Sequence, residues 1–99
     1  MATGDAARAV TTGILDCNRA EIDRQDVRLN AAYRKAMSRL GPARKARLRA
    51  LERAWIKHRE RNCDKQAEPQ AGGSLYMIIH TACFLAATSE RADYLEAYR

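Results

Sequence analysis

The sequence has few residues that interrupt helices and few that favour strands. It contains only two prolines and five glycines among 99 residues, and no stretch alternates in period two with β-branched residues. Alanine, arginine, leucine and glutamate, which favour helices, are abundant. The most apolar run, residues 75–88, is about fourteen residues long, too short to span a bilayer. These features predict one all-α domain with a small core.

Motifs of common enzymes and nucleic-acid-binding proteins are also missing. There is no glycine-rich nucleophile elbow, phosphate loop or helix-turn-helix pattern, and aromatic residues that could stack on bases are few. A nucleophile or metal site would have to combine Cys17, Cys63 or Cys83 with His58 or His80. The cysteine spacing is too wide for a standard zinc knuckle or ribbon, and structural or disulfide cysteines are the more ordinary reading. We therefore predict no enzymatic activity, metal, cofactor or small-molecule substrate, and do not expect a nucleic-acid partner.

Residues 1–10 are small and polar without periodicity, which predicts a loose N-terminal arm. Residues 11–99 form the predicted single domain. The first sixteen residues lack the apolar run of a signal peptide, so an exported protein would be represented here by its mature form.

Three helical segments are predicted within that domain. An apolar stripe runs through residues 14–40, and Gly41-Pro42 then breaks the chain. Glycine suits a left-handed residue at a helix end, and proline suits the first turn of the next helix. Because the link is short, the two long helices should be antiparallel. A third, apolar helix should begin at Leu75 and cover this hairpin.

The central helix contains the only tryptophan. Leu48, Leu51, Trp55 and Ile56 recur at helical spacing and should form one inward stripe. A buried tryptophan would contribute more apolar area than any other side chain in the chain.

A polar cluster is predicted beside Trp55. Folding the chain about Gly41-Pro42 places Asp26 opposite Trp55 and Asn30 opposite Glu52. Since burying a carboxylate without a partner is costly, we predict an Asp26–Arg59 ion pair and an Asn30–Glu52 hydrogen bond. Such a network would fix the register of the helices rather than perform catalysis.

Three ordered blocks, spread over about residues 11–95, resemble the LprI-type lysozyme inhibitor family. The first resembles its Asp-x-x-Leu-Asn-x-x-Tyr signature, the second its Leu-x-x-x-Gln-x-x-Trp-x-x-x-Arg-Asp-x-x-Cys pattern, and the third its Gly-Gly-Ser…Cys…Thr-x-x-Arg-x-x-x-Leu pattern. The matching residues are Asp26, Leu29, Asn30, Tyr33, Leu48, Trp55, Arg59, Cys63, Gly72, Gly73, Ser74, Cys83, Thr88, Arg91 and Leu95. Two positions depart from the pattern: Glu52 stands where glutamine is usual, and Glu60 where aspartate is usual.

The resemblance implies a small helical bacterial protein that is exported, either periplasmic or secreted, and sometimes lipid-anchored. Some members inhibit animal (c-type) lysozyme. Members usually carry a fourth cysteine upstream of the position of Cys17, so the resemblance implies a Cys63–Cys83 disulfide with Cys17 free. The predicted hairpin register also allows a Cys17–Cys63 bridge.

The charge distribution suggests where a partner binds. The formal charge is +6, and residues 27–51 contain eight basic residues and no acid. We call the predicted positive end of the hairpin the basic tip, which comprises Arg34, Lys35, Arg39, Arg44, Lys45 and Arg47. The leading hypothesis is that the tip occludes the carboxylate-lined cleft of a lysozyme, although such lysozymes are themselves basic. The alternatives are binding of a polyanion or of another envelope protein, and an ordinary solvated basic face.

Overall fold

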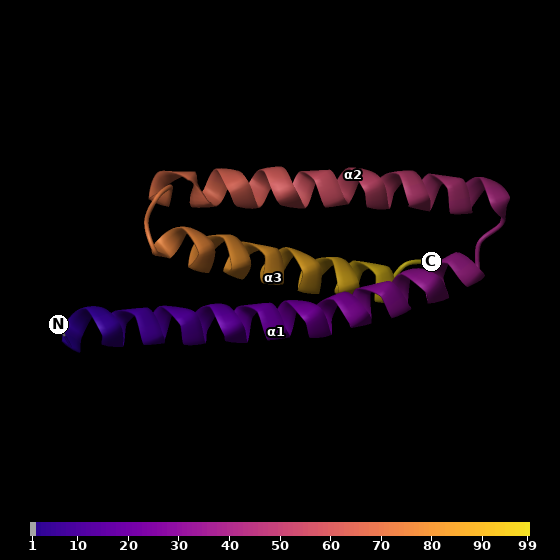
Figure 1. Cartoon of the computed structure of the whole chain (residues 1–99). Coiled ribbons are helices and arrows are strands. Elements are labelled where there is room, and N and C mark those ends of the chain that lie inside the picture. The colour runs from indigo at the N-terminus through magenta and orange to yellow at the C-terminus, as the bar shows by residue number, and fades with distance from the viewer. Residues whose placement is uncertain (1) are drawn as a thin grey trace.

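The chain folds into three long helices and a short 3-10 helix (Figure 1). The structure is a computed structural model that describes the backbone of residues 2–99 and the side chains of residues 10–99. Helix α1 spans Ala2–Ser38, α2 spans Pro42–Ala67, η1 spans Glu68–Gln70 and α3 spans Leu75–Glu96. No strand occurs in this described part of the chain. The predicted all-α fold is confirmed, and the molecule is a rod with extents of 62 × 23 × 14 Å.

The turn between α1 and α2 lies where the sequence predicts it. Pro42 occupies the first turn of α2, where its missing N–H costs nothing. Gly41 has extended backbone, with φ −77° and ψ 173°, so the expected left-handed conformation is wrong at this position. The left-handed glycine is Gly72, with φ 83°, in the turn before α3. Helices α1 and α2 are antiparallel, and α3 runs in the same direction as α1 (Figure 1).

The apolar core lies in the half of the rod near the α1–α2 turn. Helix α3 packs along α1 and also against α2. Small Ala32 and Ala36 on α1 face Ala92 and Leu95 on α3, so the helices can approach closely. Leu48 contributes from α2 and is fully buried. This core fixes the end of α1 and the start of α2 relative to the end of α3.

Two predictions about the helices are wrong. Helix α1 begins at Ala2 instead of following a loose arm over residues 1–10; this segment is rich in alanine, the strongest helix former, and residue 1 lies outside the described part. On α2, Leu51 and Ile56 are 40% and 41% exposed rather than inward. Helix α2 instead turns Leu48 and Glu52 toward its neighbours, because α3 supplies a polar partner for Glu52.

Candidate functional site

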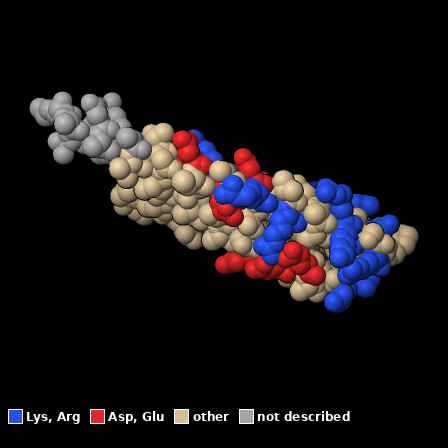
Figure 2. Space-filling model, turned by 90° about the horizontal axis from the view of Figure 1, so that it is seen from below, with Lys and Arg blue, Asp and Glu red and all other residues tan. Residues whose placement is uncertain are grey.

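The basic tip is the end of the rod at which α1 finishes and α2 begins. Lysine and arginine side chains gather at one end of the molecule in Figure 2. Five of the six predicted tip residues are exposed, and Lys45 is half-buried. None of the six forms an ion pair with a carboxylate of the described residues. Apart from Arg44, which donates to the backbone oxygen of Arg99, the tip cations carry charge that no described carboxylate compensates.

The helix ends at the tip act differently on these cations. Lys35 lies in the last turn of α1, where the negative end of the helix dipole favours a positive charge. Arg44 and Lys45 lie in the first turn of α2, which contains no acid, and there the dipole disfavours them. Arg44 offsets part of this effect by donating a hydrogen bond to the backbone oxygen of Arg99 at 2.6 Å. The first turn of α2 is thus less stable than the same turn with an acid.

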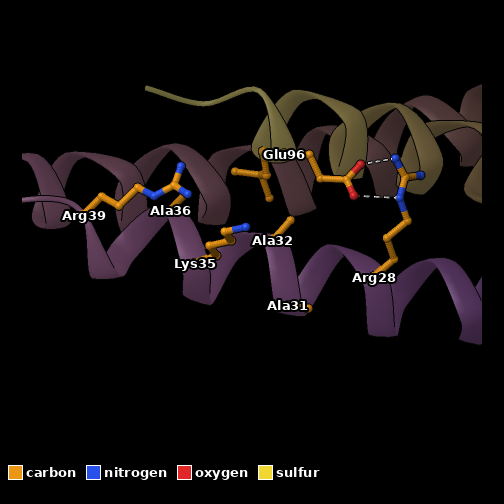
Figure 3. A pocket seen from close by; sticks show the side chains of 8 residues that line it. Arg28, Ala31, Ala32, Lys35, Ala36, Arg39 and Glu96 are labelled. Carbon is orange, nitrogen blue, oxygen red and sulfur yellow. Dashed lines mark hydrogen bonds and ion pairs between the residues drawn. The ribbon is translucent and has the colours of Figure 1, made fainter.

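A shallow groove of about 350 Å³ adjoins the tip between α1 and α3. Ala31, Ala32 and Ala36 form much of its α1 side, and Lys35 of α1 and Arg39, in the turn after α1, also line it (Figure 3). Small residues here let a bound group approach the helix closely. Two of the predicted tip residues therefore line a groove as well as the tip.

At the opposite end of this groove, Arg28 is paired with two carboxylates of α3. The Arg28 guanidinium donates to Glu96, with Nε at 3.1 Å from Oε2 (Figure 3). It also donates to Asp93. These hydrogen bonds, that to Glu96 first, raise the pKa of Arg28 above its usual range. Arg28 is thereby engaged within the fold, and Lys35 and Arg39 supply the groove's available positive charge.

A polar network lies deeper in the rod, where α2 meets α3. Arg59 Nη1 donates to Thr88 Oγ1 at 3.0 Å and lies 3.9 Å from Asp26 Oδ1. The Arg59 guanidinium carbon also lies 4.7 Å from the centre of the Trp55 ring and 4.1 Å from that of Phe84. Burial lowers the pKa of Arg59, because the cation loses hydration. Asp26 and Arg59 are thus brought together, although their separation is at the limit of an ion pair.

The predicted Asn30–Glu52 hydrogen bond is wrong. Glu52 Oε1 accepts a hydrogen bond from Arg91 Nε at 2.5 Å, and both side chains are largely buried. Asn30 is exposed. Thr88 and Arg91 match the LprI pattern in the sequence, but the two-helix register gave them no partner because both belong to the third helix. Their spacing of three residues, which puts them on one face of a helix, was the available signal.

Comparison with known proteins agrees with this architecture. The model of the family described as Lysozyme inhibitor LprI matches residues 3–95. The chain belongs to this family. Its fold is similar to that of a DUF1311 family protein from Pseudomonas putida, with a TM-score of 0.79, 22% sequence identity, and coverage of 87% of this chain and 90% of that one. Among curated proteins, no significant match is found.

The cysteines adopt the pairing that the LprI resemblance implies. Cys63 on α2 and Cys83 on α3 form a disulfide with Cα atoms 5.5 Å apart. Cys17 is a free, exposed thiol on α1. The disulfide lies toward the end of the rod away from the tip, so it ties α2 to α3 where the apolar core is thin. A disulfide fits an extracytoplasmic location.

The remaining candidate ligands do not converge. Cys63 and Cys83 are bonded to each other and supply no thiolate. His80 Nε2 lies 2.8 Å from Asp64 Oδ1, and its ring stacks between Tyr76 and Phe84. Within residues 10–99, no group of three His, Cys, Asp or Glu side chains is placed to hold a metal ion. No helix in the described part of the chain has both the length and the hydropathy to cross a membrane.

Proposed function

We propose that this protein is a non-enzymatic inhibitor of a c-type lysozyme and that its basic tip occludes the active-site cleft. Membership of the LprI family supports an inhibitory role. The disulfide supports action outside the cytoplasm, in the periplasm or after secretion. The observation that carries the proposed mode of action is the set of tip cations without carboxylate partners.

The chemistry of the target gives these cations a role. Glycosidases of the lysozyme type use two carboxyl groups that flank the bond to be cleaved. An arginine that enters such a cleft can form charge-assisted hydrogen bonds to a carboxylate, often in a bidentate arrangement. Arg44 and Arg47 on α2 and Arg39, in the turn after α1, are exposed at the narrow end of a rod, a shape suited to entering a cleft. Arg28, by contrast, already has two carboxylate partners.

The formal charge of +6 sets the expected salt dependence. Repulsion between this protein and a basic lysozyme slows their encounter at low salt, and added salt screens that repulsion. Contacts inside a desolvated cleft are screened much less. Inhibition should therefore persist, or strengthen, between low and physiological salt. Binding to a polyanion depends on counterion release and weakens steeply over the same range.

The test is the lysis of bacterial cell walls by c-type lysozyme, followed by turbidity while this protein is titrated in at low and at physiological salt. The proposal predicts inhibition at a near-stoichiometric ratio under both conditions. No inhibition at a large excess would refute it. Inhibition that disappears at physiological salt would instead favour binding of the anionic wall polymer, the alternative function.

A further inference from the structure

A second groove, of about 470 Å³, lies between α1 and α2 and has no part in the proposed action of the tip. Leu29 and Tyr33 of α1 and Ile56 of α2 give it an apolar portion. Tyr33 is half-buried and Ile56 is 41% exposed. Its walls belong to two helices that are antiparallel (Figure 1).

The α2 wall of this groove is cationic. Arg49 and Arg53 line it and are both exposed. Since they are four residues apart on one helix, their side chains lie on the same face. Neither forms an ion pair with a described carboxylate, because Glu52 is bound to Arg91. Two guanidinium groups side by side form a site for a carboxylate.

The α1 wall offers neutral and acidic hydrogen-bonding groups instead. Asn30 lines the groove and is exposed, and its amide has no hydrogen-bond partner among the described residues. A primary amide donates and accepts at once, which matches another amide group. Asp26, four residues earlier, is 48% exposed and lies near Arg59. A ligand that fits both walls therefore has an anionic group that binds α2 and an amide group that binds α1.

We propose that this groove binds an acidic, N-acylated sugar of the kind found in bacterial cell walls. In an N-acetylmuramic acid unit, one pyranose ring carries a carboxylate and an acetamido group. The carboxylate would bind Arg49 and Arg53, the acetamido group would bind Asn30, and the less polar face of the ring would lie on Tyr33 and Ile56. This binding does not depend on lysozyme inhibition.

The experiment compares N-acetylmuramic acid with N-acetylglucosamine, which has the acetamido group but no carboxylate. Backbone-amide NMR shifts of the full chain are followed during each titration. The proposal predicts shifts around the α1–α2 groove and binding of N-acetylmuramic acid roughly tenfold or more tighter than that of N-acetylglucosamine, as expected for a charge-assisted pair. No binding, or equal binding of the two sugars, would overturn it.

Matched variants locate the site. Arg49→Gln with Arg53→Gln should lose the preference for the acidic sugar, whereas Lys57→Gln with Arg61→Gln removes the same charge from the same helix and should retain it. Asn30→Ala should weaken both sugars. Unchanged binding by the first variant would overturn the proposal. So would a triglutamate peptide that binds the same groove more tightly than the sugar, since the ligand would then be an acidic peptide.

Discussion

The buried pair of Glu52 and Arg91 yields the sharpest stability prediction. Arg91 Nε lies 2.5 Å from Glu52 Oε1, and the two side chains are 14% and 10% exposed. Removing one partner of a buried pair leaves the other charge without compensation and typically costs about 3–5 kcal/mol. Arg91→Met and Glu52→Leu should each cost about this much. The double variant places two apolar side chains together and should lie close to the wild type, because replacing a whole buried pair is often neutral or stabilising.

The assay is urea unfolding followed by circular dichroism, with the three variants forming a double-mutant cycle. With single-variant costs of about 3–5 kcal/mol each and a double variant near the wild type, the predicted coupling energy is about 6 kcal/mol or more. Each single variant should lower the melting temperature by more than about 10 °C. Single-variant costs below about 1 kcal/mol, or costs that simply add in the double variant, would refute the buried-pair reasoning. Glu52→Gln is the informative control, since its amide oxygen can still accept from Arg91 and the loss should be smaller.

The other stability predictions concern the disulfide, the start of α2 and an acid on α1. Replacing Cys63 and Cys83 by alanine should cost about 3 kcal/mol, from the 20-residue separation that the bridge closes; calorimetry that finds no change would contradict this. Ala43→Glu adds an acid to a first turn that has none and should stabilise by about 0.3–1 kcal/mol at low salt; a thermal melt showing destabilisation would count against the dipole argument. Hydrogen bonding, chiefly from Gln25, lowers the pKa of Glu21 below its ordinary 4.5. The ionised Glu21 therefore stabilises the folded state above pH 4.5, and this stabilisation is lost as the pH falls through the lowered pKa. Glu21→Gln should therefore flatten the acid side of the profile of melting temperature against pH, and an unchanged profile would contradict the assignment.

The elements that the sequence predicts well are those set by local chemistry. Gly41-Pro42 predicts the turn because proline cannot continue the first helix but can start the second. The stripe that includes Leu29 and Leu40 is correct because apolar residues recur at the helical period. Leu75 is the first residue of α3, as expected from the loop residues before it. Each of these signals acts within a few residues of the feature it predicts.

The errors on α2 and in the polar cluster occur where a distant helix decides the outcome. Periodicity counts only apolar residues, so it placed Leu51 and Ile56 inward and gave Glu52 no weight. In the structure Glu52 is buried because Arg91 of α3 neutralises it. The hairpin register did bring Glu52 and Asn30 to one groove, but a two-helix argument could not foresee the competing partner.

In the candidate site, too, some features follow from the local sequence and others from tertiary contacts. The run of basic residues without an acid is visible in the sequence, and the turn brings its two halves to one end of the rod. Which cations remain available is a tertiary property. Arg28 belongs to the same run as Arg34 and Lys35, yet only Arg28 finds carboxylates on α3.

The most direct test of the central claim compares two charge-matched variants in the lysozyme assay. One replaces Arg44, Lys45 and Arg47 with serine at the tip, and the other replaces Lys57, Arg61 and Lys65 with serine on the other half of α2. Each variant removes three positive charges, and circular dichroism checks that both fold. We expect inhibition weaker by at least about tenfold for the tip variant and nearly unchanged inhibition for the other. Equal inhibition by the two variants would contradict the claim that the basic tip occupies the cleft.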